Sequence, residues 1–453
     1  MLKITFLGAG STVFARNVLG DCMSSEALRE CEIALYDVNA QRLKESEKIL
    51  SAINKGKGNY SKIFSYTENE NLEPQPGSGT KGSSLEKALA GASFVVNAIQ
   101  VGGYNPATIA DFEIPKKYGL RQTIGDTLGI GGIMRALRTI PVMETFARAI
   151  EKMCPDAWLL NYSNPMSMLT GYMQRYTGVK TAGLCHSVQV CSRSLLNELG
   201  MNDKLDGRRE LIAGINHMGW LLDIRDKDNN DLYPEIKKRA KEKNQNEKHW
   251  DMVRYDYIDK LGFYCTESSE HNAEYNPYYI KSKYPQLIND FNIPLDEYPR
   301  RCIEQIDGWK TEYESLVKAD TLEHQRSQEY ASYIMESIVT GVPYKIGGNV
   351  LNTGGSIENL PYEACVEVPC LVDNSGIKAC HFGRLPVQLA AMNMTHINVH
   401  LITVEAAVTK KRDHIYHAAM LDPHTAGELS LDDIRAMTDE LLEAHRIWLP
   451  EYK

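Results

Sequence analysis

The apolar run Leu2-Lys-Ile-Thr-Phe-Leu7 leads directly into Gly8-Ala-Gly10-Ser11-Thr12, and this junction of strand and turn decides the fold. A glycine at position 8 permits a tight turn, and one at position 10 lets the backbone approach a pyrophosphate. The amides of Ser11 and Thr12 then open a helix, whose N-terminus attracts anions. The stretch predicts an α/β fold with an N-terminal Rossmann-type doubly wound sheet, in which Gly8, Gly10, Ser11 and Thr12 bind a dinucleotide.

Two later strands support a dinucleotide site over an ordinary turn between strand and helix. The strand Ile33–Tyr36 ends at Asp37, whose carboxylate is placed to accept hydrogen bonds from the adenosine ribose hydroxyls. A carboxylate repels a 2′-phosphate, so NAD is favoured over NADP. The strand Ser93–Ile99 ends at Gln100, a further candidate cofactor contact. The third glycine of the usual pattern is replaced by Val13, so the motif alone is weak evidence.

Composition limits the class of protein. The chain has 453 residues, 43% of them hydrophobic, and a formal charge of −9, which predicts a large core in two interlocked lobes and disfavours nucleic acid as a partner. No apolar run is long enough to cross a membrane, and no leader precedes the first strand. The ten cysteines are irregularly spaced and do not resemble a disulfide framework. We expect a cytoplasmic protein.

The periodicity predicts a division near residue 195. Residues 1–195 alternate strands and helices, as an NAD-binding Rossmann-like domain requires. Residues 196–453 are of mixed α+β character, with helices near 385–412 and 429–447, and are expected to bind substrate and metal and to form the contacts of a homodimer or homotetramer. The polar segment Glu68–Ser84 is predicted to be an exposed loop.

Cys185 and His186 follow the predicted strand Lys180–Leu184. Ligands bind beyond the carboxyl ends of parallel strands, so both residues lie where chemistry is expected. A thiolate and an imidazole are soft metal ligands, and His217 offers a second imidazole. The sequence therefore predicts a metal beside the cofactor. Taken singly, each residue would be a buried thiol or a hydrogen-bonded core histidine.

The glycine-rich stretch 121–132 is predicted to be a loop. It lacks the lysine of a P-loop, so nucleotide triphosphate chemistry is not expected. Asp126 within it is either a turn residue or a carboxylate that tunes a neighbouring acid or base. His396 and His400 lack the glutamate of a metalloprotease motif and are interpreted as structural.

Taken together, these motifs resemble the NAD-dependent family 4 glycoside hydrolases, specifically their α-galactosidase branch, over essentially the whole chain. The resemblance rests on Gly8-Ala-Gly-Ser11, Asn161-Tyr-Ser-Asn-Pro165, Cys185-His-Ser-Val188, Gly214-Ile-Asn-His217, Glu267-Ser-Ser-Glu-His271, Ala273-Glu-Tyr275 and Asp296-Glu-Tyr-Pro-Arg-Arg-Cys302.

The resemblance implies an unusual route to hydrolysis, since this family is an exception to the mechanism with two carboxylates. NAD⁺ would take hydride from C3 of the sugar, while Mn²⁺ or another divalent metal binds the C2 and C3 oxygens. A base then removes the acidified C2 proton, and the glycosidic oxygen leaves from C1. Water adds to the unsaturated intermediate and NADH returns the hydride, so no net redox change results.

The resemblance also implies roles for individual residues. Cys185 and His217 would hold the metal. Tyr275 would be the base, with Tyr278 and Tyr279 left open as alternatives, and Asp126 would raise the basicity of that tyrosine. The role of leaving-group acid falls to His186, to a metal-bound water or to another group.

The substrate expectation depends on His186. Members of the family that act on phosphorylated sugars carry Asp or Asn at this position, so His186 predicts an unphosphorylated sugar, and the motif around it favours an α-galactoside. Asn164 would bind sugar hydroxyls. Arg301 would contact the substrate, with a surface ion pair as the alternative. An α-glucosidase or α-glucuronidase of the same family, a hydroxy-acid NAD dehydrogenase and a non-catalytic NAD sensor remain as other hypotheses.

Overall fold

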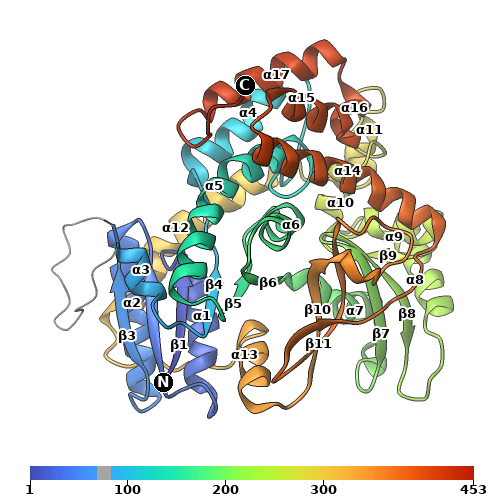
Figure 1. Cartoon of the computed structure of the whole chain (residues 1–453). Coiled ribbons are helices and arrows are strands. Elements are labelled where there is room, and N and C mark those ends of the chain that lie inside the picture. The colour runs from blue at the N-terminus through green and yellow to red at the C-terminus, as the bar shows by residue number, and fades with distance from the viewer. Residues whose placement is uncertain (69–82) are drawn as a thin grey trace.

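The computed structural model describes residues 1–68 and 83–453. The predicted Glu68–Ser84 loop falls almost entirely outside these residues. The strands lie in one continuous twisted sheet, whose described order is β3-β2-β1-β4-β5-β6-β10-β11-β7-β8-β9, with β12 paired to β11 (Figure 1).

The first six strands form a parallel doubly wound sheet. In the order β3-β2-β1-β4-β5-β6, each pair of neighbours is parallel. The order reverses between β1 and β4, which is the point where such sheets bind dinucleotides. The predicted Rossmann-type sheet is therefore confirmed. The strands are β1 Leu2–Leu7, β2 Cys31–Tyr36, β3 Lys62–Tyr66, β4 Phe94–Asn97, β5 Trp158–Asn161 and β6 Lys180–Gly183.

Helices connect these strands and cover both faces of the sheet (Figure 1). Asn39 caps the helix after β2 by accepting a hydrogen bond from the amide of Arg42, as short polar side chains do at helix starts. The helices are α1 Thr12–Ser24, α2 Ala40–Gly56, α3 Ser84–Leu89, α4 Ile109–Lys117, α5 Gly129–Met153, α6 Met166–Tyr176 and α7 His186–Glu198, with a π-helical turn at Gly103–Thr108 before α4.

The second half extends the same sheet with antiparallel strands. Asn349 of β10 pairs with Gly183 of β6, and a Cβ at Gly183 would lie 2.6 Å from the Met166 sulfur and 2.8 Å from the Asn349 Cβ. The junction therefore requires a glycine. The strands are β7 Arg209–Ile215, β8 Met218–Arg225, β9 Tyr264–Cys265, β10 Tyr344–Leu351, β11 Cys365–Asp373 and β12 Gly376–Ala379.

The helices of the second half surround these strands. Both long helices predicted near the C-terminus are present, as α14 and α17. The helices are α8 Tyr233–Asn246, α9 Met252–Leu261, α10 Ser269–Tyr275, α11 Gln286–Asp290, α12 Glu297–Lys318, α13 Ala331–Thr340, α14 Val387–Thr409, α15 Arg412–Leu421, α16 Pro423–Glu428 and α17 Leu431–Ala444, with 3₁₀ turns at Asn202–Lys204 and Asn352–Gly354.

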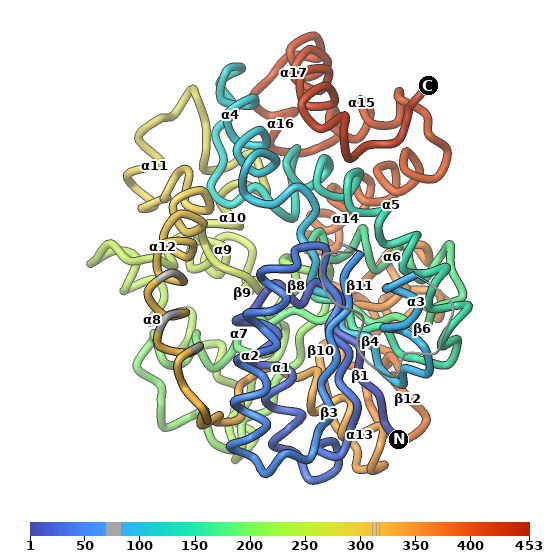
Figure 2. Tube along the Cα trace, turned by 90° about the vertical axis from the view of Figure 1, so that its left-hand side faces the viewer, coloured from blue at the N-terminus to red at the C-terminus, as the bar shows by residue number. Residues whose placement is uncertain are grey.

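The C-terminal helices pack on the N-terminal half. Helix α14 contacts α5 and α6, and α17 contacts α4 (Figure 2). A buried ion-pair network joins these elements: Asp111 of α4 accepts hydrogen bonds from Arg138 and His445, each at 2.7 Å. The two halves interlock, and the domain division at residue 195 stays a prediction.

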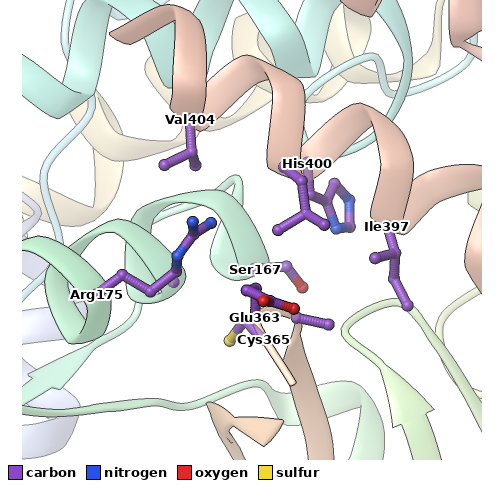
Figure 3. Close-up of a pocket in the computed structure, with 10 residues that line it drawn as sticks. Ser167, Arg175, Glu363, Cys365, Ile397, His400 and Val404 are labelled. Atoms are coloured by element: carbon purple, nitrogen blue, oxygen red, sulfur yellow. The ribbon is translucent and has the colours of Figure 1, made fainter. Parts of the chain in front are cut away.

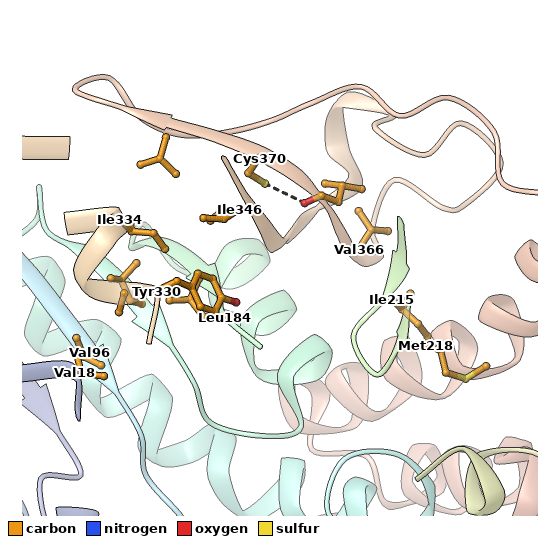
Figure 4. Close-up of a cluster of buried hydrophobic side chains, with 14 of the residues drawn as sticks. Val18, Val96, Leu184, Ile215, Met218, Tyr330, Ile334, Ile346, Val366 and Cys370 are labelled. Atoms are coloured by element: carbon orange, nitrogen blue, oxygen red, sulfur yellow. Dashed lines mark hydrogen bonds between the residues drawn. The ribbon is translucent and has the colours of Figure 1, made fainter. Parts of the chain in front are cut away.

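One hydrophobic core runs through both halves. Val18 and Val96 of the parallel part belong to the same buried cluster as Tyr330, Val366 and Met218 (Figure 4). The cluster includes Leu184, which follows β6, Ile215 at the end of β7 and Ile346 within β10. Residues that follow these strands are therefore held on a rigid support.

The prediction of a loop over residues 121–132 is wrong from Gly129 onward, because α5 begins at this residue. A Cβ at Gly131 would lie 2.1 Å from the Gly125 carbonyl oxygen, and one at Gly132 would lie 2.4 Å from the Thr127 carbonyl oxygen. The glycines let the first turn of α5 press against the loop that carries Asp126. Their pattern reflects close packing of a helix start against the loop before it.

Within residues 1–68 and 83–453, no helix has the length and apolar character that a membrane crossing requires. All ten cysteines are described, all are free thiols, and Cys380 alone is exposed.

Candidate active site

The turn after β1 depends on its glycines. Gly8 has φ of +86°, a conformation that glycine adopts without strain, and a Cβ there would lie 2.7 Å from the Ala98 carbonyl oxygen. The amide of Gly10 donates to the Asp37 carboxylate at 2.7 Å. The structure thus brings the predicted cofactor residues Gly8, Gly10 and Asp37 together at the switch point of the sheet.

The other predicted cofactor residues lie around this turn. Ser11 is exposed and precedes α1. The Thr12 side chain accepts a 3.0 Å hydrogen bond from Ser46, so its backbone amide, not its hydroxyl, is available to a ligand. Gln100 donates to Thr108 at 3.4 Å. Val13 is 45% exposed, which explains why this position needs no glycine for packing of the helix against the strand.

We expect Gly10→Ala to weaken NAD binding at least about tenfold, which corresponds to about 1.4 kcal/mol. The new Cβ would lie 2.7 Å from the Asp37 carboxylate oxygen, so the turn or the carboxylate must move. Titration of NAD by fluorescence quenching measures the change. Gly354→Ala is the control, because nothing lies within 4 Å of a Cβ there and its backbone is not left-handed. Equal NAD affinities for the two variants would contradict the prediction.

Three metal-ligating side chains converge beyond the ends of the strands. The Cys185 sulfur, a His217 ring nitrogen and a Glu267 carboxylate oxygen all lie within 4.8 Å of one another. Cys185 follows β6, His217 stands in the turn between β7 and β8, and Glu267 follows β9. Sequence reasoning paired Cys185 with His217 and missed Glu267 as a donor. Its place within the Glu267–His271 motif was the available signal.

Two of the three donors sit on strained backbone. His217 has φ of +65° and Glu267 has φ of +64°, the left-handed region that residues with a Cβ rarely adopt. Such strain persists only where the surroundings impose it, and it gathers at functional sites. The strained turns aim both side chains at Cys185.

The three side chains differ in their pKa shifts. Burial lowers the pKa of His217, so the imidazole is neutral and able to ligate. Burial opposes ionisation of Glu267, but the neighbouring His271 holds its pKa down to about 2. Burial, followed by the charges of Glu267 and Glu367, raises the pKa of the Cys185 thiol, so this group must release its proton to bind a metal. A thiolate, a neutral imidazole and a carboxylate are a donor set typical of a divalent transition metal.

Tyr275 adjoins this cluster through His217. Its hydroxyl lies 2.8 Å from the second ring nitrogen of His217, Nδ1, while the first, Nε2, lies 3.4 Å from Glu267. Burial, followed by the charges of Asp126 and Glu267, raises the pKa of Tyr275. Of the two alternatives, Tyr278 is 52% exposed and Tyr279 donates to Asp256. Only Tyr275 of the three contacts His217.

The Asp126 loop is tied to Tyr275 through the preceding residue, Glu274. The Glu274 carboxylate accepts hydrogen bonds from the amides of Thr123 at 2.7 Å and Gly125 at 2.8 Å. Asp126 follows directly and accepts a hydrogen bond from Thr127 at 2.8 Å. Sequence reasoning missed Glu274, whose role depends on a loop about 150 residues away.

His186 opens helix α7 and faces Glu329. The ring Nε2 lies 2.6 Å from a Glu329 oxygen, and the ring stacks on Tyr162 with centroids 5.7 Å apart. Burial lowers the pKa of His186, but the bond to Glu329 and its charge outweigh burial and raise the pKa overall. The sequence did not identify Glu329 as a functional residue.

The predicted substrate residues have contrasting surroundings. The Asn164 side-chain oxygen is buried and has no partner among the described residues, so it can accept a hydrogen bond from a ligand. Arg301 forms ion pairs with Glu270 at 2.5 Å and Glu297 at 2.9 Å. The neighbouring strand end is structural, because Asn161 accepts a hydrogen bond from Asn97 in a buried network.

A small cavity lies elsewhere, between α6 and α14 (Figure 3). Ser167, Arg175 and His400 are among its lining residues, which include none of the predicted site residues. Its volume is about 10 Å³, the room of a single water molecule. The cavity cannot hold a sugar.

Glu367 of β11 should make the metal-free protein less stable as the pH rises. It is fully buried, and burial raises its pKa from the usual 4.5 to about 7. Between these values the unfolded chain releases the proton and the folded chain keeps it, so the free energy of unfolding falls, by on the order of 3 kcal/mol. Glu367→Gln should remove this part of the fall. Urea unfolding at pH 4.5 and 7.5 in chelator tests it, and equal pH dependence in both proteins would contradict it.

Comparison with known proteins identifies the family to which this chain belongs. Residues 3–201 match the family described as "Family 4 glycosyl hydrolase", and residues 212–425 match the "Family 4 glycosyl hydrolase C-terminal domain". The chain belongs to the family 4 glycosyl hydrolases, so the recognised resemblance is confirmed.

Particular relatives share its full length. The chain is 56% identical to an "Alpha-galactosidase" of Bacillus subtilis (strain 168), over 100% of both chains. It is 32% identical to an "Alpha-galactosidase" of Rhizobium meliloti (strain 1021), over 99% of this chain and 89% of the other. Among solved structures, a 6-phospho-alpha-glucosidase from gut microorganisms, in complex with NAD and Mn²⁺, has the same fold, with a TM-score of 0.79 and 19% identity over 100% of both chains.

Proposed function

We propose that this protein hydrolyses α-galactosides, using NAD and a divalent metal such as Mn²⁺. The observation that carries the proposal is the convergence of Cys185, His217 and Glu267 beside Tyr275, in a chain related over its full length to an alpha-galactosidase. The sugar enters between this cluster and the turn after β1.

Both groups fit the residues present. Gly8, Gly10 and Asp37 suit the pyrophosphate and ribose of NAD, and the donor cluster suits Mn²⁺. NAD supplies a hydride acceptor at C3 of the sugar, and the metal supplies Lewis-acid polarisation of the neighbouring oxygens. We place Glu267 beside Cys185 and His217 as a third protein ligand.

The side chains of this protein supply binding and proton transfer. Tyr275 takes the proton from C2, and Asp126 favours this step because its negative charge raises the basicity of the phenolate. His186 gives a proton to the glycosidic oxygen as it leaves C1. Asn164 accepts a hydrogen bond from a sugar hydroxyl, and Arg301 borders the site from α12.

An unphosphorylated sugar fits the charge beside His186. Glu329 lies 2.6 Å from the His186 ring, and its carboxylate would repel a phosphate group. α-Glucosides and α-glucuronides are the next candidates, and a glucuronide carboxylate would meet the same repulsion. We further propose that the protein acts in the cytoplasm, where its ten free thiols stay reduced, and that it assembles as a homodimer or homotetramer.

The test is hydrolysis of p-nitrophenyl α-galactoside by the purified chain with NAD⁺, Mn²⁺ and reductant. We expect release of p-nitrophenol, uptake of solvent deuterium at C2 and no accumulation of NADH. The same assay with α-glucosides, α-glucuronides and 6-phosphates ranks the sugars. Stoichiometric NADH formation would indicate a dehydrogenase instead, and turnover after complete removal of NAD would refute the mechanism.

A further inference from the structure

Three consecutive residues at the start of helix α13 contact residues of the candidate active site. The Glu329 carboxylate meets the His186 ring at 2.6 Å. The Tyr330 hydroxyl donates to the Cys185 carbonyl at 3.0 Å. The Ala331 amide donates to the Tyr162 hydroxyl at 3.1 Å. We call Glu329–Ala331 the brace.

A buried carboxylate on α1, the helix that follows the dinucleotide turn, holds the brace in place. Asp21 is fully buried and accepts hydrogen bonds from the amide and the hydroxyl of Ser327, at 2.8 and 2.6 Å. His324 also faces Asp21 at 2.7 Å. The Ser327 hydroxyl in turn accepts a hydrogen bond from the Glu329 amide at 3.1 Å. The position of Glu329 is therefore tied to the helix that follows the dinucleotide turn.

The His186 ring needs such a support because its own burial does not fix it. The side chain is 48% exposed, whereas that of Glu329 is 9% exposed. The ring packs on Tyr162 and lies edge to face with Phe14, with centroids 6.0 Å apart. Aromatic packing limits the plane of the ring but does not determine whether Nε2 or Nδ1 faces Glu329. The bond from Nε2 to Glu329 fixes this orientation.

We propose that Glu329 is a positioning residue that orients His186 toward the glycosidic oxygen. The inference rests on the proposed function, in which His186 protonates the leaving group. In that step the bond between C1 and the glycosidic oxygen breaks, and the oxygen keeps the electron pair. It takes a proton from His186, which is left as neutral imidazole and regains a proton from water. Glu329 acts through His186 and does not touch the sugar.

The leaving group distinguishes this role from general support of the fold. Melibiose must expel a sugar alkoxide, which needs a proton, whereas p-nitrophenolate leaves without one. For Glu329→Gln we expect kcat with melibiose to fall about 100-fold, the scale of general acid catalysis. With p-nitrophenyl α-galactoside kcat should stay within about threefold, since this substrate does not need the interaction. KM should change little for both substrates.

Three further variants complete the experiment. Glu336→Gln on α13, which removes the ion pair with Arg326, is the matched control and should leave both substrates unaffected. Ser327→Ala keeps Glu329 and removes the bond to its amide, so the same substrate-dependent loss should appear on a smaller scale, even if Glu329→Gln fails to fold. In the pair His186→Asn and Glu329→Gln, the double variant should be no worse than His186→Asn alone, because one residue acts through the other.

The outcomes separate the two proposals. Cleavage of no glycoside by the wild-type chain with NAD⁺ and Mn²⁺ overturns the proposed function and this inference with it. If the wild type cleaves another α-glycoside, the comparison of leaving groups is made on that sugar. A wild type that cleaves, combined with equal losses or no losses on the two substrates in Glu329→Gln and Ser327→Ala, overturns this inference alone.

Discussion

Replacing Cys185 by serine should lower Mn²⁺ affinity at least about 100-fold and hydrolysis about 1,000-fold or more, because the loss of a soft metal ligand removes Lewis-acid catalysis as well. The serine hydroxyl is a poor ligand at neutral pH and is shorter in reach than the sulfur, which lies within 4.8 Å of the His217 and Glu267 donors. Mn²⁺ binding is measured by electron paramagnetic resonance, apart from any activity, and hydrolysis by p-nitrophenol release.

Cys191→Ser provides the control for loss of a buried thiol. Cys191 is on α7, the helix that begins directly after Cys185, and is buried in a hydrophobic cluster. We expect this variant to lose thermal stability and to retain Mn²⁺ affinity. Unchanged Mn²⁺ affinity in Cys185→Ser would remove Cys185 from the metal site.

Replacing Tyr275 by phenylalanine should reduce kcat about 1,000-fold, within the range of a lost general base. The change removes the hydroxyl that lies 2.8 Å from His217 and keeps the ring that fills the core. NAD and Mn²⁺ should still bind, and the exchange of the C2 hydrogen for solvent deuterium should be lost together with hydrolysis. Mass spectrometry of the product measures the exchange.

Tyr278→Phe and Tyr279→Phe test the alternatives left open by the sequence. Tyr278 is half exposed, and the Tyr279 hydroxyl is occupied by Asp256. Both variants should keep the exchange at C2. If either lost exchange while Tyr275→Phe retained it, the base would have to be assigned anew.

The parallel half of the fold could be predicted because its signals are local. The strands β1, β2, β4, β5 and β6 are apolar runs that end in, or are followed by, glycine or polar residues, and a pattern of this kind needs no knowledge of distant contacts. The pairing of β10 with β6 joins Asn349 to Gly183, more than 160 residues apart. Such a junction depends on tertiary packing, which no window of sequence contains.

The candidate site likewise contains residues that the sequence could identify and residues that it did not. Cys185, His217 and Tyr275 could be proposed because their residue types and motifs carry chemistry. Glu267 was missed although it stands in a recognised motif, and Glu329 had no motif at all, because a glutamate is ordinary until a fold brings it to a particular partner. A strained turn places Glu267, and the brace that is tied to helix α1 places Glu329.

The continuous sheet also limits which segments of this enzyme could be exchanged by recombination. Cys185 belongs to the segment matched by one family description, while His217 and Glu267 belong to the segment matched by the other. Neither segment holds all three side chains of the cluster. A recombination between residues 201 and 212 would therefore combine a cluster from two parents and would also require the Gly183 and Asn349 junction to fit.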